Sequence, residues 1–106
     1  MENNTLNPVK LPEDALCKIA ECLKVLAHPI RLMMVDLLMQ GEYPVNRIAE
    51  LCGLPPHQTC EHLRLMQSHG LLAGIRRGRS VYYRVAAPGL PDIMACIRKN
   101  CGQASD

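Results

Sequence analysis

Apolar residues recur at three- and four-residue steps in several stretches of the chain, which predicts amphipathic helices. The first helix starts near residues 11–14, where a proline and two acids suit a first turn. The second follows His28, a candidate cap, with Pro29 in its first turn, and it ends at Gly41. Three further helices are predicted at about residues 46–52, 55–70 and 91–101.

Three of the predicted helices, the first, the second and the last, each carry an apolar stripe that must pack against other apolar surface. The stripe of the first helix consists of Leu16, Ile19, Ala20, Leu23 and Leu26. That of the second is expected to face inward and consists of Ile30, Met33, Met34, Leu37 and Leu38. That of the last consists of Leu90, Ile93, Met94, Ile97 and Cys101. A small domain has little left to cover both the first and the last stripe, which predicts a two-fold homodimer.

The middle of the chain has the pattern of a helix-turn-helix. Gly53 can end the shorter helix in a left-handed cap, and Pro55-Pro56 can open the longer one. The inward face of the longer helix is predicted to hold Thr59, His62, Leu63 and Met66, and its outer face His57, Gln58, Glu61 and Arg64. In this motif the second helix lies in the major groove of DNA, so the outer face is a candidate reading surface.

From residue 71 the period changes to the alternation of strands, which predicts a β-hairpin. Residues 72–75 and 80–85 form its strands, Arg77-Gly78 its turn, and residues 42–44 are expected to be only a short extended link. The fold class is therefore mainly α with a small β-hairpin: a winged helix-turn-helix. It is expected to occupy residues 11–101, between a disordered arm at 1–10 and a tail at 102–106.

Composition adds a local charge imbalance. The 106-residue chain has a net charge of only +2, and residues 1–61 carry five Lys/Arg against eight Asp/Glu. Residues 62–91 instead carry five arginines and no acid, which indicates a basic surface for nucleic acid. No signal peptide or membrane-spanning run is apparent, so we expect a cytoplasmic protein with reduced cysteines. No arrangement of nucleophile and base has a plausible cleft, so we expect no enzyme.

The outer face and the wing supply the predicted DNA contacts. Gln58 can pair with adenine, and Glu61 can accept a hydrogen bond from cytosine N4. Phosphate anchors are available in Arg64, His57 and the hydroxyl of Thr59. At the wing tip, Arg76, Arg77 and Arg79 can reach the minor groove or the DNA backbone. His62 and His69 are expected to be structural.

The six cysteines fall into three pairs. Cys17 and Cys22 lie in the first helix and Cys96 and Cys101 in the last, in both cases five residues apart. That spacing corresponds to a rise of about 7.5 Å and a rotation of about 140°, so neither pair can form an unstrained disulfide or share an ion within its helix. Any thiol chemistry must therefore join different helices, and the first helix against the last, across a dimer seam, is the natural place. The third pair, Cys52 and Cys60, is expected to serve mainly in packing.

Three segments carry a family resemblance. LAHPIRL at 26–32, HLRLMQSHGLL at 62–72 and RRGRSVYYRV at 76–85 resemble the ArsR/SmtB family of bacterial winged-helix repressors. The resemblance covers about residues 12–101. It implies a homodimer built on the first and last helices, a sequence-specific operator in double-stranded DNA, and derepression by a metal, metalloid or oxidant.

The resemblance also indicates which known sensing sites are missing. Pro44 and Asn46 stand where some members have a Cys-x-Cys, and the last helix offers Asp92 but no histidine for a zinc or cobalt site. Asp36 stands roughly where the persulfide sensors have the first of their two cysteines, although Cys101 fits the second. The members that bind trivalent arsenic through the last or first helix are the most similar, and they imply Cys17, Cys22, Cys96 and Cys101 as sensing residues.

The leading interpretation is a DNA-binding repressor without an obligatory cofactor, released by arsenite, As(III), or a soft metal ion. One alternative is release by an oxidant or persulfide through cysteine oxidation. An alternative of another class is a winged-helix protein-interaction module that binds no DNA. The acid-free basic stretch argues against the last of these.

Overall fold

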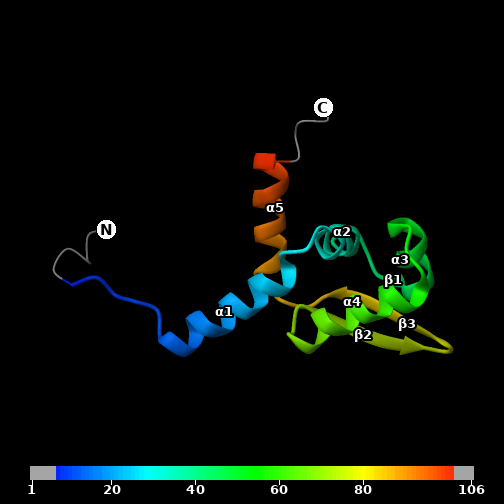
Figure 1. Ribbon diagram of the computed structural model, residues 1–106, viewed down its shortest axis with the longest axis horizontal. Coiled ribbons are helices and arrows are strands. Elements are labelled where there is room, and N and C mark those ends of the chain that lie inside the picture. Colours follow the sequence, from blue (N-terminus) through cyan, green and yellow to red (C-terminus); the bar gives the residue numbers. More distant parts are fainter. Residues whose placement is uncertain (1–6, 102–106) are drawn as a thin grey trace.

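The computed structural model describes residues 7–101, which form five helices and one three-stranded antiparallel sheet (Figure 1). The elements, in chain order, are α1 (Glu13–Leu26), α2 (Pro29–Leu38), β1 (Tyr43–Pro44), α3 (Val45–Cys52), α4 (Pro56–Ser68), β2 (Leu72–Arg77), β3 (Ser80–Val85) and α5 (Leu90–Cys101). The predicted winged helix-turn-helix is confirmed. Residues 7–10 are exposed and precede the first helix; the rest of the predicted arm and the predicted tail lie outside the described residues.

The helix ends follow the predicted local chemistry. Nδ1 of His28 accepts a hydrogen bond from the backbone N–H of Ile30 at 3.2 Å, and Pro29 is the first residue of α2. Gly53 ends α3 in the left-handed region, with φ of 69°, a conformation in which a side chain would be strained. These two features mark the corners between α1 and α2 and between α3 and α4.

The sheet contains one strand more than the sequence predicted. Its order is β1-β3-β2, and Tyr43 of β1 pairs with Tyr83 of the central strand β3. The supposed link at 42–44 therefore joins the wing to the chain just before α3. The hairpin itself is also longer, since β2 runs to Arg77, which pairs with Ser80. The turn is consequently Gly78-Arg79 rather than Arg77-Gly78.

The core lies between α2, α3, α4 and the inner face of the sheet. It is aliphatic and rich in methionine, because the chain has no phenylalanine or tryptophan. Its most deeply buried apolar side chains are Met34, Val35, Ile48, Leu63 and Met66. Met33, predicted to face inward, is 42% exposed, whereas the neighbouring Val35 is fully buried. The buried face of α2 is therefore rotated by part of a turn from the predicted face.

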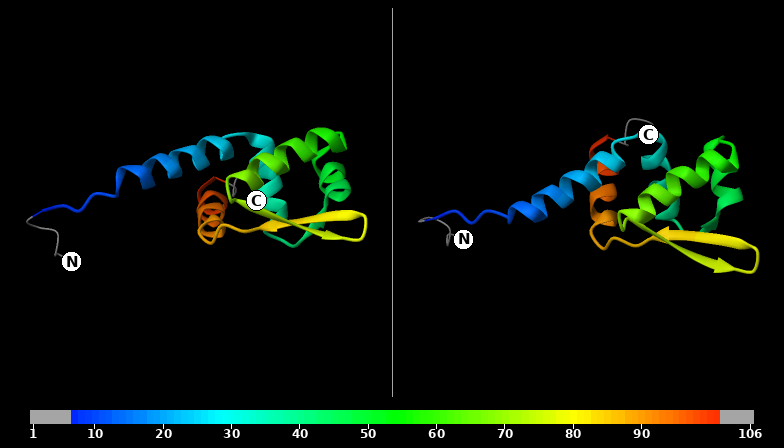
Figure 2. Two further views of the ribbon diagram at one scale, coloured as in Figure 1. Left: turned by 90° about the horizontal axis from the view of Figure 1, so that it is seen from below. Right: turned by 60° about the horizontal axis from the view of Figure 1, so that its bottom comes forward.

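The outer helices α1 and α5 extend away from this core (Figures 1 and 2). Only Val25 and Leu26 of α1 and Leu90 and Met94 of α5 are buried. The rest of their predicted stripes stays in contact with solvent, and the side chain of Leu23 is 51% exposed. The other exposed members are Leu16, Ile19, Ala20, Ile93, Ile97 and Cys101. Within residues 7–101, no helix combines the length and the apolar character needed to cross a bilayer.

Candidate functional site

The second helix of the helix-turn-helix, α4, has an exposed polar side and a buried apolar side, as its sequence predicts. His57, Gln58, Glu61 and Arg64 are all exposed along one side, and Leu63 and Met66 are fully buried on the other. Nε2 of His57 lies 3.6 Å from Oε2 of Glu61, one turn further along. The exposed side therefore presents donors and acceptors of the kind that read base edges.

Thr59 is the one predicted contact on α4 that the structure contradicts. Its side chain is fully buried, and its hydroxyl donates a hydrogen bond to the carbonyl oxygen of Pro55 at 3.1 Å. A hydroxyl that is enclosed and already bonded cannot reach a DNA phosphate, so the assignment of Thr59 as an anchor is wrong. The predicted position of Thr59 on the inward face of the helix already indicated that its hydroxyl would be buried.

A cleft opens between the start of α4, the start of α3 and the wing. Its lining includes Asn46, His57, Cys60 and Arg79. Both helices begin after a proline, and neither has a side-chain cap for its first N–H groups. Uncapped helix N-termini carry partial positive charge, which adds to that of Arg79. Asn46 was not among the predicted contacts, although it lies in the first turn of α3.

The three wing arginines have different surroundings. Nη2 of Arg77 lies 2.9 Å from Oε1 of Glu42, and its guanidinium carbon lies 5.0 Å from the ring centroid of Tyr82. Within residues 7–101, neither Arg76 nor Arg79 has an acidic partner, and both are exposed. The basic tip predicted from the sequence is therefore less positive than its arginine count suggests.

A histidine cluster joins α4 to the body behind the reading face. Nε of Arg31 donates to Nδ1 of His62 at 3.1 Å, and Nη1 of Arg31 donates to the carbonyl oxygen of Val25 at 3.0 Å. The ring of His28 meets that of His62 edge to face, with centroids 4.9 Å apart. Burial, reinforced by the charge of Arg31, lowers the pKa of His62. His62 is thus a structural acceptor, as predicted.

The predicted sensing cysteines are not brought together within one protomer. Cys17, Cys96 and Cys101 are exposed, and Cys22 is partly buried beside the carbonyl oxygen of His69. No group of three potential metal ligands forms among residues 7–101. Burial raises the pKa of Cys52, which agrees with its predicted packing role.

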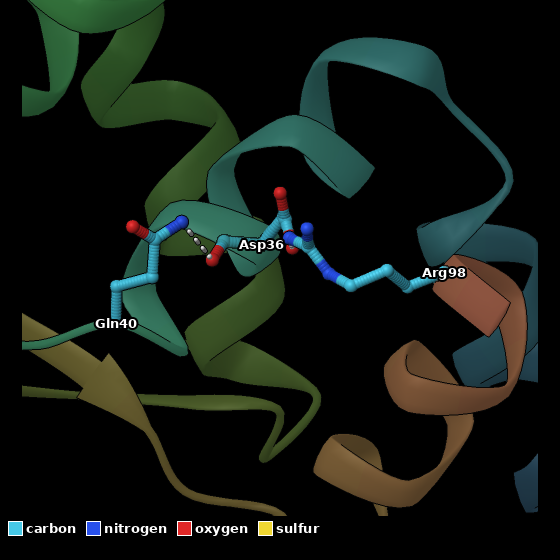
Figure 3. A network of polar contacts seen from close by, with 3 residues as sticks. All are labelled: Asp36, Gln40 and Arg98. Atoms are coloured by element: carbon cyan, nitrogen blue, oxygen red, sulfur yellow. Dashed lines mark hydrogen bonds and ion pairs between the residues drawn. The ribbon is translucent and has the colours of Figure 1, made fainter. Parts of the chain in front are cut away.

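The outer half of α5 is tied to α2 by an ion pair between Arg98 and Asp36 (Figure 3). The side-chain amide of Gln40, two residues beyond the end of α2, donates to the backbone oxygen of Asp36 at 3.4 Å. Arg98 lies between Cys96 and Cys101 in the sequence. The position of the cysteine-bearing end of α5 is thus linked to the helix that packs behind the reading unit.

Comparisons with known proteins agree with this architecture, although no protein-family model matches the chain. The transcriptional regulator NmtR of Mycobacterium tuberculosis is 37% identical over 73 residues, which cover 69% of this chain and 61% of NmtR. The transcriptional repressor SmtB of the same organism is 30% identical over 96 residues, which cover 91% of this chain and 71% of SmtB. The chain thus spans about three fifths to seven tenths of these relatives.

Among solved structures, the homodimeric winged helix-turn-helix DNA-binding domain of Mb0332 from Mycobacterium bovis superposes with a TM-score of 0.77 at 28% identity. The match covers 92% of this chain and 94% of that domain. NmtR is described as a transcriptional regulator and SmtB as a transcriptional repressor, which agrees with the class of protein that the sequence predicts.

Proposed function

Because the chain belongs to the ArsR/SmtB family of winged helix-turn-helix transcriptional regulators, we propose that it is a dimeric repressor released from its operator by thiol chemistry. The observation that carries the DNA-binding part is the exposed polar side of α4, which lies beside the cleft with its two uncapped helix N-termini. Gln58 and Glu61 are the proposed base contacts. His57, Arg64, Arg76 and Arg79 are the proposed phosphate contacts.

The exposed stripes of α1 and α5 support a homodimer. Five large apolar side chains lie on these two helices with much of their surface in solvent. Contiguous exposed apolar surface of this kind marks a binding site for protein. In a two-fold dimer the two copies of α4 would lie about one DNA turn apart, near 34 Å. The homodimeric state of the Mb0332 domain is consistent with this arrangement.

The cysteines Cys17, Cys22, Cys96 and Cys101 are the proposed sensors. Since they do not meet within a protomer, they are proposed to combine across the dimer seam. Arsenite or another soft ion suits thiolate ligands and can gather sulfurs from more than one helix. Binding there would favour a relative position of the protomers in which the two copies of α4 no longer fit successive major grooves. A coupling of about 1–3 kcal/mol is typical of such regulation.

DNA binding is tested with a duplex from the promoter of the chain's own gene, followed by fluorescence anisotropy. Gln58→Ala should cost about 1–3 kcal/mol of discrimination at one base pair. Arg79→Ala should weaken all sequences alike and reduce the slope of log affinity against log salt by about one. If the wild-type chain binds no duplex, the alternative of a winged-helix module that contacts only protein takes its place.

The inducer is tested by titrating the preformed DNA complex under strict reduction. Release by arsenite in the presence of reductant supports the soft-ion proposal. Release only by peroxide or a persulfide donor supports the redox alternative, in which an interhelical disulfide or polysulfide forms. A variant with both Cys96→Ser and Cys101→Ser should lose the response, whereas Cys52→Ser is the matched control and should keep it. An unchanged response in the double variant would refute the seam site.

A further inference from the structure

Arg77 occupies a position in the wing that its neighbours in sequence do not share. Its side chain starts at the end of β2, on the face that carries Tyr82, since Arg77 pairs with Ser80 two residues away on β3. From there it passes over the Tyr82 ring and reaches the carboxylate of Glu42, which directly precedes β1. The arginine therefore crosses the central strand and connects the two edges of the sheet.

The sequence alone concealed this contact. Residues 62–91 contain no acid, so all three wing arginines appeared to be available for DNA. The fold brings Glu42 from the preceding segment to within 2.9 Å of Arg77. A planar guanidinium can stack on an aromatic ring and pair with a carboxylate at the same time. The compact ammonium of a lysine is less suited to this double contact.

The strand that Arg77 reaches is part of the reading unit. β1 leads without a gap into α3, the first helix of the helix-turn-helix. A two-stranded hairpin on its own holds its orientation poorly in water. The contact with Glu42 adds a tie between the far end of the hairpin and the segment from which α3 starts.

We propose that Arg77 is a positioning residue that fixes the angle of the wing against α3, and that it is not a phosphate contact. This inference rests on the proposed DNA-binding function and assigns the direct wing contacts to Arg76 and Arg79. Arg77 acts through the sheet: it holds the tip where those two side chains meet the DNA backbone.

The first test compares Arg77→Gln with Arg79→Gln in anisotropy titrations at several salt concentrations. Each phosphate contact contributes about 0.9 to the slope of log affinity against log salt. Arg77→Gln should weaken binding roughly fivefold, the scale of an exposed ion pair plus a cation–π contact, and leave the slope at the wild-type value. Arg79→Gln should reduce the slope by about one. A matching reduction in Arg77→Gln would overturn the proposal.

A second test leaves every charge in place. Tyr82→Leu removes the ring under the guanidinium, and Tyr82→Phe keeps it. We expect Tyr82→Leu to weaken DNA binding by a few-fold with an unchanged salt slope, and Tyr82→Phe to bind as the wild type does. Equal affinities for the two variants would show that the ring does not position Arg77 and would count against the proposal.

A third test needs no DNA and so separates this inference from the proposed function. Hydrogen exchange is measured in the free protein at the Tyr43 amide, the one backbone N–H of β1, and at the amides of β3. Arg77→Gln and Glu42→Gln should both accelerate exchange there, by a few-fold, while Arg79→Gln should not. Unchanged exchange in the first two variants would refute the tie. If exchange is faster but the wild type binds no DNA, the proposed function fails and the tie stands.

Discussion

Helices α1 and α4 carry similarly spaced apolar residues, but those of α4 are buried and most of those of α1 are exposed. Leu63 and Met66 of α4 are fully buried by their own protomer. Ile19 and Leu23 of α1, spaced just as regularly, remain about half exposed. The helical period thus identifies the apolar face of a helix, but it does not identify which surface packs against that face. An amphipathic helix left uncovered in a protomer marks a surface that another molecule must complete.

The α5 helix shows both behaviours within one element. Leu90 and Met94 are buried against the body, whereas Ile93 and Ile97 face solvent. The reading unit therefore has a core that is completed within one protomer, whereas the exposed stripes of α1 and α5 are the surface proposed for dimerisation. The loss of stability on substitution should differ between the two regions, both in its size and in its dependence on chain concentration.

The largest effect is expected in the completed core. Leu63→Ala removes a fully buried side chain and should lower the free energy of unfolding by about 3 kcal/mol. Urea denaturation followed by circular dichroism measures this loss, which should persist when the chain is diluted. The matched Leu23→Ala should cost little in dilute solution and more as the chain concentration rises. A concentration-independent loss of equal size at Leu23 would contradict the contrast.

Charges placed on the seam should act on assembly and leave the fold intact. A double variant, Ile19→Glu with Leu23→Glu, should raise the dimer dissociation constant by about a hundredfold, since it buries two charges against apolar surface. Sedimentation at micromolar concentration measures the change. Met39 is also exposed and apolar but lies outside the stripes, so Met39→Glu is the control and should stay dimeric. A dimeric double variant would place the interface elsewhere.

Acid should loosen the junction behind α4. Burial chiefly lowers the pKa of His62, Arg31 and His28 add to this, and Glu61 opposes it. A histidine whose pKa is lower in the folded state binds its proton more readily when unfolded, so its contribution to stability is complete above about pH 6.5 and is lost as the pH falls through the folded value. The urea midpoint should therefore be lower at pH 5.5 than at pH 7.5.

His62→Gln provides the control for this pH dependence. A glutamine oxygen can still accept the hydrogen bond from Arg31, but the group does not titrate. Part of the change between the two pH values should disappear in this variant. If the wild type and His62→Gln lose the same stability on acidification, the loss arises at other groups.

The smallest effect concerns the tie between α2 and α5. Asp36→Asn removes the charge that pairs with Arg98, and an exposed pair of this kind contributes about 0.5 kcal/mol. The unfolding midpoint should shift slightly, while hydrogen exchange in the last turns of α5 should accelerate. Gln40→Ala keeps the ion pair and is the matched control. Unchanged exchange in Asp36→Asn would show that packing alone holds α5.

Local sequence chemistry was sufficient for most of the fold. The cap at His28, the corner at Gly53 and the alternation in the hairpin each depend on neighbouring residues, and all three are confirmed. β1 was missed because two residues are too few to show alternation. The period of α2 placed Met33 inward because it cannot distinguish two adjacent apolar positions on a helix that is apolar over most of its surface.

The candidate site was less accessible from the sequence, since its details depend on contacts between distant segments. The outer face of α4 followed from helical spacing, but the enclosure of Thr59 depends on how tightly α4 packs. The pairing of Arg77 with Glu42 joins residues that no local pattern connects. The proposed joining of the α1 and α5 cysteines requires a second chain, whose position no sequence spacing can supply.

A dimer formed through α1 and α5, as proposed, would also make the chain sensitive to its own dosage. Where single protomers prevail, the amount of a two-fold assembly rises with the square of chain concentration, so halving synthesis would lower it about fourfold. A promoter controlled by such an assembly would respond steeply to gene copy number and to proteolysis, before any inducer arrives. Cell division distributes the copies by chance in unequal shares, so the occupancy of the operator would then differ between sister cells.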